Sequence, residues 1–336
     1  MLLTTVDCDA LLAAALPAYG FTRAADVRLL SLSENGTYRV REGGRTVVAR
    51  VHRHGYQDAA SIASEMAWTD ALRTQVGVRT PAVVPTLDGR RFTTIRRPEG
   101  ERHVALFEHV AGANGEETDL PLPVAELGAL TARMHGQVEA WRLPDGFRRF
   151  RWDAAACLGT GDGRDARWGS WRDVPGLAAA AVPLLAEAAE HVAERLSDYG
   201  TGPDRFGLVH ADLRLANLMI DDAGGITVID FDDCGFGWFL YDLATVTSWL
   251  EHEESTPATV AEWVAGYTTV RPLTEADHAM VPTFVLLRRL MLSAWLGTHP
   301  DSPPAQQLGT SYAAGTVLLA DRYLHDPSWL AVGAPA

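Results

Sequence analysis

The stretch LVHADLRLANLMIDDAGGITVIDFDD, residues 208–233, decides the fold of this chain. It contains two short apolar runs, 218–220 and 226–229, separated by a turn that ends in Gly224 and Gly225. Such a pattern is typical of a β-hairpin, because glycine adopts the backbone angles that tight turns need. The sequence therefore predicts two paired strands here, with polar residues at the ends of the hairpin.

Three polar side chains around this hairpin indicate chemistry. Asn217 stands directly before the first strand and Asp230 ends the second, so the hairpin would bring their oxygens close together. Amide and carboxylate oxygens suit Mg²⁺ that carries the phosphates of a nucleotide. Asp212, on the loop before the hairpin, is then placed to take a proton from a hydroxyl. The plainer alternative is an acidic surface hairpin of a β-rich protein.

The order His-x-Asp, then Asn, then a distal Asp is the spacing of a phosphoryl-transfer loop. Residues 208–233 resemble the catalytic segment of the aminoglycoside phosphotransferase and choline kinase-like superfamily, most of all its homoserine-kinase-like branch. The resemblance implies an α+β fold of the bilobal protein-kinase type. A small antiparallel-sheet N-lobe is expected at 1–110 and a larger, mainly helical C-lobe at 111–336. ATP and Mg²⁺ are the implied cofactors.

The resemblance also assigns roles within the loop and hairpin. Asp212 is the expected catalytic base, and His210 would brace the loop by hydrogen bonds. Asn217 and Asp230 are the expected metal ligands. Asp232 would hold a second metal ion or contact the acceptor. Arg214, inside the loop, would stabilise the charge of the transferred phosphate.

In the expected N-lobe, the resemblance points to residues that bind the nucleotide. The turn with Ser33, Asn35 and Gly36 resembles a phosphate-facing turn of the homoserine-kinase-like enzymes, although it lacks a full G-x-G-x-x-G. The third strand carries Arg50 where the superfamily usually has lysine, and arginine offers a two-pronged donor to phosphate. Glu65, within a predicted helix at 58–75, is the expected partner of this arginine. Plain surface roles are the alternatives for both charged residues.

The remaining N-lobe elements follow from hydrophobic periodicity and turn residues. Strands are expected at 27–32, 37–41, 46–52, 91–95 and 102–110, after a first helix at 9–19. By resemblance, the end of the last strand is the hinge that binds adenine through its backbone. The hinge residues are Glu108, His109 and Val110.

Helical periodicity dominates the rest of the chain. Helices are expected at 123–140, 177–198, 236–250, 259–267, 275–296 and 306–323. His135 is expected to be structural, and the resemblance gives Asp242 a bracing role on the catalytic loop. Arg288 and Arg289 could reach the acceptor site, but a solvated or ion-paired role is preferred.

The segment 141–172 is rich in tryptophan and arginine and contains a glycine run at 158–163. The run lacks the Lys-Ser/Thr ending and the strand–turn–helix context of a P-loop, so we interpret it as an exposed loop. Aromatic and arginine side chains here are expected either to form a wall of the acceptor pocket or to pack between helices.

Composition narrows the class of protein. The 336 residues are 47% hydrophobic and 21% charged, which is typical of a soluble globular protein. A net charge of -14 argues against binding to nucleic acid or to an anionic membrane. The three cysteines suggest no disulfide framework and fit a reducing, cytoplasmic location. No apolar run is expected to span a bilayer, and a monomer or homodimer is expected.

Three functions therefore remain open. The first is a kinase for the hydroxyl of an amino alcohol, amino acid, sugar or antibiotic, in the last case a resistance enzyme. The second is a protein Ser/Thr kinase of the same superfamily. The third is a non-catalytic nucleotide-binding protein, which the exchange of lysine for arginine at position 50 keeps in view.

Overall fold

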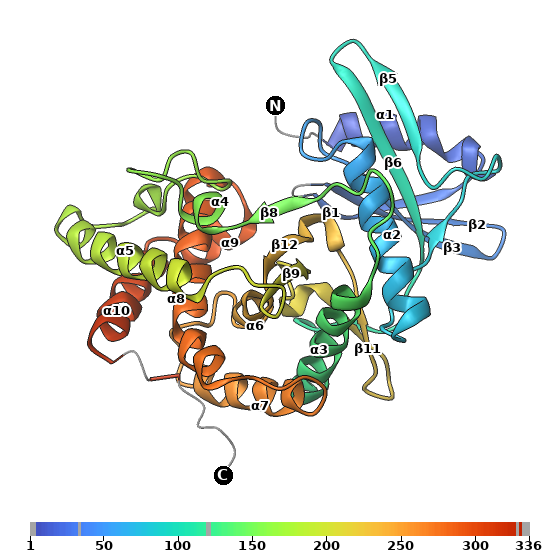
Figure 1. Ribbon diagram of the computed structural model, residues 1–336. Helices are drawn as coiled ribbons and strands as arrows, with labels where there is room; N and C mark the ends of the chain where they lie inside the picture. Colours follow the sequence, from blue (N-terminus) through green and yellow to red (C-terminus); the bar gives the residue numbers. More distant parts are fainter. Residues whose placement is uncertain (1–4, 33–34, 119–121, 327–328, 331–336) are drawn as a thin grey trace. The chain divides into compact units, whose positions relative to one another are not determined.

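The computed structural model describes residues 5–32, 35–118, 122–326 and 329–330 (Figure 1). The chain divides into two compact units. Unit 1 comprises residues up to 113 together with 142–149 and 219–232, and unit 2 comprises 114–141, 150–218 and the residues from 233 onward.

Unit 1 is built on an antiparallel sheet with the strand order β1-β2-β3-β6-β4, in which β5 also pairs with β6. The predicted strands of this unit are confirmed within a few residues. The strands are β1 (Asp26–Leu32), β2 (Gly36–Glu42), β3 (Arg45–Val51), β4 (Val83–Val84), β5 (Thr93–Arg97) and β6 (Gly100–Glu108). The helices of unit 1 are α1 (Thr5–Ala15), the 3₁₀ turn η1 (Leu16–Tyr19) and α2 (Ala59–Gln75).

The two faces of this sheet carry different helices. Side chains alternate between the faces of a strand, and Val104 and Leu106 of β6 belong to the apolar cluster that contains α1. Ala105 and Phe107 belong instead to the cluster that contains α2. Arg50 of β3 lies opposite Ala105 in the register, so the alternation places its side chain on the α2 face.

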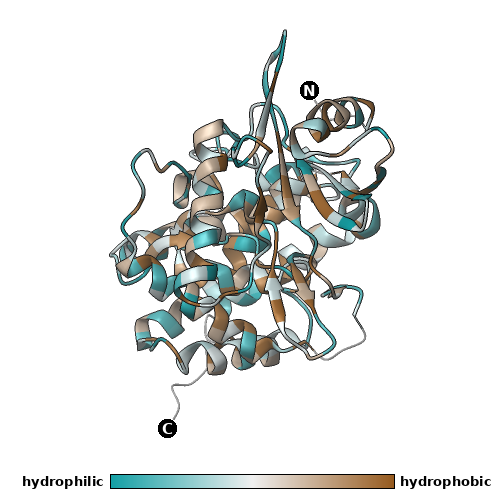
Figure 2. Ribbon diagram, turned by 90° about the vertical axis from the view of Figure 1, so that its right-hand side faces the viewer, coloured by the Kyte–Doolittle hydropathy of each residue, from teal (hydrophilic) through white to brown (hydrophobic). Residues whose placement is uncertain are grey.

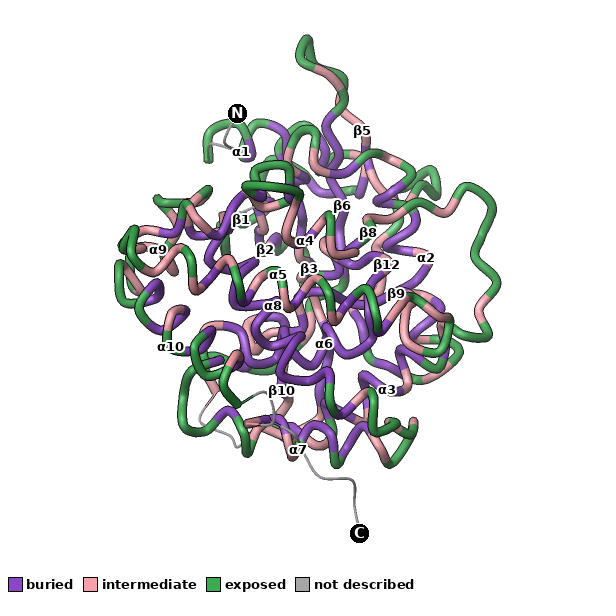
Figure 3. Tube along the Cα trace, turned by 60° about the vertical axis from the view of Figure 1, so that its left-hand side comes forward, coloured by how far each residue is buried: buried purple, intermediate pink, exposed green. Residues whose placement is uncertain are grey.

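The hairpin of β5 and β6 extends beyond the rest of the sheet. Its tip is hydrophilic and exposed, whereas β6 is buried from Arg102 to Phe107 (Figures 2 and 3). Apolar residues are therefore confined to the part of the hairpin that the helices cover.

The hairpin predicted from residues 218–229 is confirmed. It consists of β10 (Leu218–Ile220) and β11 (Ile226–Val228), which pair with each other. In its turn, the Asp221 carboxylate accepts the N–H groups of Ala223 and Gly225 and an N–H of the Arg79 guanidinium at 2.7 Å. The Arg79 carbonyl accepts the N–H of Val228 at 3.0 Å, which ties the hairpin to unit 1.

Unit 2 is mainly helical. Its α-helices are α3 (Val124–Ala140), α4 (Ala154–Leu158), α5 (Val182–Tyr199), α6 (Phe239–Val246), α7 (Thr256–Thr268), α8 (Glu275–Thr298), α9 (Pro303–Leu308) and α10 (Ser311–His325). The short 3₁₀ helices are η2 (Trp171–Asp173), η3 (Ala179–Ala181) and η4 (Leu215–Asn217) in unit 2, with η5 (Phe231–Asp233) at its border. Strand β7 (Ala113–Asn114) lies at the other border.

The prediction of one helix across 236–250 is wrong at its start. Residues Gly235–Trp238 form strand β12, which lies between β8 (Phe150–Trp152) and β9 (Phe206–Val209). A β-carbon at Gly235 would lie 2.7 Å from the carbonyl oxygen of Phe150, so glycine permits the close strand contact. Helix α6 begins only at Phe239.

Helix α8 corrects the expectation that no apolar run has the length of a membrane span. By length and composition it is long enough, but 89% of its apolar window is buried inside the protein (Figure 3). Because most of its apolar stretch is buried, α8 is a core helix of the protein.

Candidate functional site

Unit 1 buries a group of four charged and polar side chains, here called the Arg50 cluster: Asn35, Arg50, Glu65 and Asp232. The Arg50 guanidinium lies 2.8 Å from the Glu65 carboxylate and 3.5 Å from that of Asp232. Asn35 donates from Nδ2 to the second Asp232 oxygen at 2.9 Å. All four side chains are buried. The expected pairing of Arg50 with Glu65 is therefore present within unit 1.

The Arg50 guanidinium contacts two carboxylates in this cluster, and the pKa values of these two groups shift in opposite directions. Burial raises the pKa of Glu65 and outweighs the effect of Arg50. Burial also raises the pKa of Asp232, but Arg50, His52 and Arg149 outweigh it and hold that pKa below its usual range. Asp232 is therefore the more strongly anionic of the two carboxylates.

The backbone at Asp232 is held as firmly as its side chain. Its carbonyl oxygen accepts an N–H from the Gln57 side chain at 2.7 Å and another from Arg149. Arg149 also donates to the Phe231 carbonyl at 3.3 Å. Asp232 thus has one hydrogen-bond donor on each carboxylate oxygen and further donors on its carbonyl, and the metal-binding role expected for it stays a prediction.

Asp230 has a different setting. It follows β11 with a left-handed backbone (φ 59°) and is exposed. Its charge raises the pKa of Arg50, together with the charges of Glu65 and Asp232, against the opposing effect of burial. Asp230 therefore lies in the field of the Arg50 cluster without being buried in it.

The expected phosphate-facing turn falls partly outside the described residues, because Ser33 is not among them. Asn35 turns its side chain inward: besides its bond to Asp232, its Oδ1 accepts the N–H of Arg53 at 3.0 Å. Packing explains why position 36 is glycine: a β-carbon there would lie 2.8 Å from the Cys8 sulfur of α1.

The expected hinge follows the end of β6. Glu108 pairs with Val47 of β3, and its N–H donates to the Ala82 carbonyl at 2.8 Å. The Glu108 N–H is thus already used. His109 and Val110 follow the last residue of β6, and the adenine-binding role expected for residues 108–110 stays a prediction.

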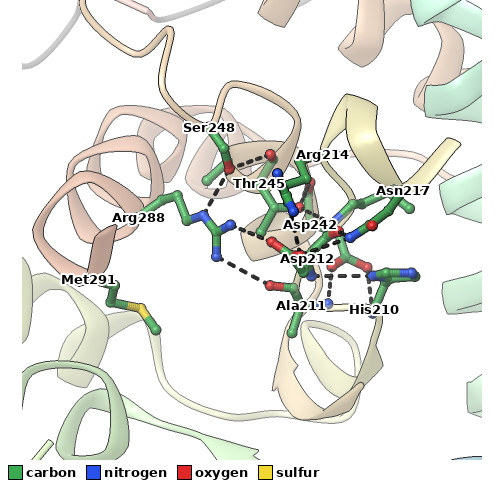
Figure 4. Close-up of polar contacts among 12 residues, drawn as sticks. His210, Ala211, Asp212, Arg214, Asn217, Asp242, Thr245, Ser248, Arg288 and Met291 are labelled. Atoms are coloured by element: carbon green, nitrogen blue, oxygen red, sulfur yellow. Dashed lines mark hydrogen bonds and ion pairs between the residues drawn. The ribbon is translucent and has the colours of Figure 1, made fainter. Parts of the chain in front are cut away.

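In unit 2, the loop that carries His210 and Asp212 is held by Asp242 of α6 (Figure 4). The Asp242 carboxylate accepts the backbone N–H groups of His210 at 3.0 Å and Ala211 at 2.8 Å. It also lies 3.1 Å from Nε2 of His135, which is itself fully buried and bonded to Tyr267. This confirms the bracing role predicted for Asp242 and the structural role predicted for His135.

His210 supports Asp212 directly, because its Nδ1 accepts the N–H of Asp212 at 3.2 Å. The Asp212 carboxylate takes an N–H from Arg288 on Oδ1 at 2.5 Å and, on Oδ2, one from Arg214 at 3.2 Å and one from Asn217 at 2.8 Å (Figure 4). Burial alone would raise the pKa of Asp212, but Arg214 and Arg288 hold it below its usual range. The carboxylate is therefore ionised and fixed in direction.

Asn217 presents an oxygen that suits a metal ion. Its Nδ2 donates both to the Asp212 carbonyl and to the Asp212 carboxylate, each at 2.8 Å, so neither bond uses the oxygen Oδ1. Asn217 and Asp230 belong to different units. Within the described part of the chain, no three His, Cys, Asp or Glu side chains gather around a common point. Mg²⁺ takes oxygen ligands and usually keeps water and phosphate oxygens beside them, so the oxygen that Asn217 presents suits this ion.

Arg288 is the residue that sequence reasoning ranked too low. A solvated role is wrong for both Arg288 and Arg289, because both are buried. The ion-paired role is right: Arg289 pairs with Glu251 at 2.9 Å, and Arg288 pairs with Asp212. Two arginines inside the apolar run VPTFVLLRRLMLSAW were the available signal, since a buried charge requires a partner.

The basic residues of this chain are uniform in type, and one of them lies beside the tryptophan-rich segment. All 29 basic residues of the chain are arginine, so the arginine at position 50 is part of a chain-wide absence of lysine. In the segment 141–172, the Trp168 ring lies 5.5 Å from the Arg288 guanidinium. Part of this segment thus packs beside the arginine that pairs with Asp212.

Comparisons with known proteins identify the family of this chain. Residues 26–278 match the model of a family described as the phosphotransferase enzyme family. The chain belongs to this family. Its α+β fold is the kinase-like fold of that family, and the chain is a phosphotransferase of the small-molecule kinase type.

Three relatives of this phosphotransferase show how far the similarity extends. A solved microcompartment-associated aminopropanol kinase is 46% identical, with a TM-score of 0.88 over 95% of this chain and 98% of the other. A homoserine kinase of Pseudomonas aeruginosa is 30% identical over 80% of this chain and 79% of its own. Amicoumacin kinase of Bacillus subtilis is 24% identical over 84% and 83%.

Proposed function

We propose that this phosphotransferase moves the γ-phosphate of ATP to the hydroxyl of a small amino alcohol. The observation that carries the proposal is the Asp212 carboxylate, ionised and fixed by Arg288, Arg214 and Asn217. Such a group orients a hydroxyl and takes its proton late in the reaction. The amino alcohol is chosen because the aminopropanol kinase is 46% identical over nearly the whole chain.

The nucleotide is assigned mainly to unit 1. Arg50, directed by Glu65 at 2.8 Å, holds phosphate oxygens, and the backbone at 108–110 holds adenine. Asn217 and Asp230 are proposed as ligands of Mg²⁺ from the sequence pattern and from the oxygens they present. When bound, the ion neutralises charge on the β- and γ-phosphates. Asp232 is assigned to the Arg50 cluster, where each of its carboxylate oxygens accepts one hydrogen bond, and its place at a second metal ion stays a prediction.

The proposed phosphoryl transfer forms one bond to phosphorus and breaks one. The acceptor oxygen bonds to the γ-phosphorus, the bond from that phosphorus to the β,γ-bridging oxygen breaks, and ADP leaves. The hydroxyl proton moves to the Asp212 carboxylate. Arg214, whose Nε lies 3.2 Å from Asp212, is the proposed donor that stabilises charge on the transferred phosphate.

The test uses the purified full chain with ATP and Mg²⁺. ADP release is measured with 1-amino-2-propanol, ethanolamine, homoserine, a sugar and an aminoglycoside, and labelled phosphate is followed into protein. We expect turnover with an amino alcohol, and we expect Asp212→Asn to lower kcat by about 10²–10⁴-fold while ATP binding is retained. Removal of Mg²⁺ by a chelator should abolish turnover.

Other outcomes would point to the alternatives. Phosphate that appears in protein rather than in the small molecules would indicate a protein kinase. ATP binding without ADP release from any mixture would indicate a non-catalytic nucleotide-binding protein. An Asp212→Asn enzyme with unchanged kcat would overturn the assignment of the base.

A further inference from the structure

Arg288 is an unusual residue for the middle of a core helix. It lies in α8 among Leu286, Leu287 and Leu290, which are all buried, and its own side chain is 1% exposed. A buried guanidinium is costly unless its N–H groups are bonded. The position of those partners therefore indicates what the residue does.

The guanidinium is held on three sides (Figure 4). Its Nε donates to the Ser248 hydroxyl at 2.9 Å. Its Nη1 lies 3.2 Å from the Tyr241 hydroxyl. Nη1 is also 3.5 Å from the carbonyl oxygen of Ala211 in the catalytic loop. These contacts fix the plane of the guanidinium and leave Nη2 directed at Asp212.

Nη2 meets one particular oxygen of the catalytic carboxylate. It lies 2.5 Å from Oδ1 of Asp212, whereas Asn217 and Arg214 both donate to Oδ2. A carboxylate oxygen accepts about two hydrogen bonds. Oδ2 therefore has its full number from these two donors, and Oδ1 is the oxygen that has room for an acceptor hydroxyl.

From this arrangement we infer that Arg288 is a positioning residue for phosphoryl transfer, which directs Oδ1 of Asp212 to the acceptor hydroxyl and places Nη2 beside the attacking oxygen. The inference rests on the proposed function. A hydroxyl bonded to Oδ1 shares that oxygen with Nη2. As the oxygen–phosphorus bond forms and the proton passes to Oδ1, the guanidinium remains next to the new phosphate ester.

A lysine cannot replace this arrangement. The Arg288 fork bonds Ser248 and Tyr241 on one side and Asp212 on the other. An ammonium group is a single point of charge on a flexible stem, and it cannot hold both sides in one plane. The Trp168 ring, 5.5 Å from the guanidinium, adds a planar neighbour that suits arginine.

The neighbouring Arg289 offers a matched control. It is equally buried and equally well bonded, to Glu251 at 2.9 Å, to Thr316 at 2.8 Å and to the Tyr312 carbonyl at 2.8 Å. These partners belong to a different network from the partners of Arg288. Loss of a buried arginine as such should therefore affect both positions, whereas loss of base positioning should affect Arg288 alone.

The experiment compares Arg288→Ala, Arg288→Lys and Arg289→Lys in the full-length enzyme with ATP, Mg²⁺ and the best acceptor. For both Arg288 variants we expect kcat to fall about 100-fold or more, with the KM for ATP within about twofold of the original, as for removal of one fixed donor at a reacting centre. Free guanidinium ion should restore part of the activity of Arg288→Ala, while methylammonium at the same concentration should not. Arg289→Lys should keep its kcat within about threefold.

Each other outcome has a defined meaning. A wild-type enzyme that turns over no acceptor removes the proposed function, and the inference falls with it. If the wild type is active, a kcat of Arg288→Lys near the original, or equal losses at both arginines without guanidinium rescue, reduces Arg288 to a structural residue. If Arg288→Ala fails to fold, Ser248→Ala provides the test: it keeps the charge but frees Nε, and an unchanged kcat in that variant overturns the inference.

Discussion

The Asp242 carboxylate accepts the N–H of Ala211 at 2.8 Å, and Ala211 holds a left-handed backbone with a φ of 68°. The same carboxylate accepts the N–H of His210 and contacts His135. Asp242→Asn replaces one acceptor oxygen by a donor that would face these N–H groups. We expect a loss of about 2–4 kcal/mol in unfolding free energy, because buried donors lose their partner.

The activity of Asp242→Asn should fall further than its stability explains, because the loop that carries Asp212 is no longer held. Urea unfolding and kcat under native conditions measure the two effects. Asp222→Asn, in the exposed turn of the hairpin, is the control and should leave both unchanged. Equal stability of Asp242→Asn and the wild type would show that the loop is held by other contacts.

Arg50 joins two carboxylates and also lies over the Phe107 ring, at 4.9 Å. Arg50→Met should cost about 3–5 kcal/mol, because it leaves Glu65 and Asp232 buried without their cation. Arg50→Lys should cost less than half of that and should raise the KM for ATP, since one ammonium cannot serve both carboxylates and phosphate. Denaturation and nucleotide titration measure the two changes.

A double-mutant cycle of Arg50→Met and Glu65→Gln measures the interaction energy between these two residues apart from the other contacts of the cluster. The losses from Arg50→Met and Glu65→Gln should be far from additive, because each removes the same ion pair. Additive losses would show that Glu65 does not direct Arg50.

Local pattern accounts for most of what the sequence predicted. The hairpin at 218–229 and the alternation along β3 follow from apolar spacing and turn residues, which are properties of neighbouring positions. The pairing of Arg50 with Glu65 spans only a strand and the next helix, and the resemblance supplied it in advance. Strand β12 was missed because its apolar residues merge with those of α6, so the periodicity of the helix covered a four-residue strand.

Long-range polar partners account for most of what was not predicted. Arg288 and Asp212 are 76 positions apart, and Asn35 and Asp232 are 197 apart. The local sequence around one partner does not identify the other, because such bonds form only when separate elements pack together. The sequence left Arg288 either solvated or ion-paired, and only the fold identifies Asp212 as its partner.

His52 should make stability depend on pH. It is fully buried, both ring nitrogens lack a hydrogen-bond partner among the described residues, and burial and then Arg50 lower its pKa to about 3. Asp232 opposes this shift, while His103 and Arg149 add to it. Between pH 6.5 and 3 the unfolded chain binds a proton that the folded chain does not, so stability falls as the pH falls through this range.

At pH 5 the loss from His52 relative to pH 7 should be about 2 kcal/mol, from an ordinary histidine pKa of about 6.5. His52→Asn should remove most of this difference in unfolding free energy. His54→Asn, at an exposed position two residues on, is the control and should keep it. The same pH dependence in both variants would mean that His52 is protonated in the folded protein.

Helices α3 and α7 approach so closely that glycine is required at their contact. A β-carbon at Gly266 would lie 1.8 Å from the Ala125 carbonyl oxygen, and one at Gly128 would lie 2.1 Å from that of Trp263. Gly266→Ala must push two helix backbones apart, so we expect a loss of about 3 kcal/mol in urea unfolding. Gly136→Ala, in α3 with nothing within 4 Å, should instead gain up to about 1 kcal/mol from helix propensity. A neutral Gly266→Ala would show that the two helices pack less tightly than described.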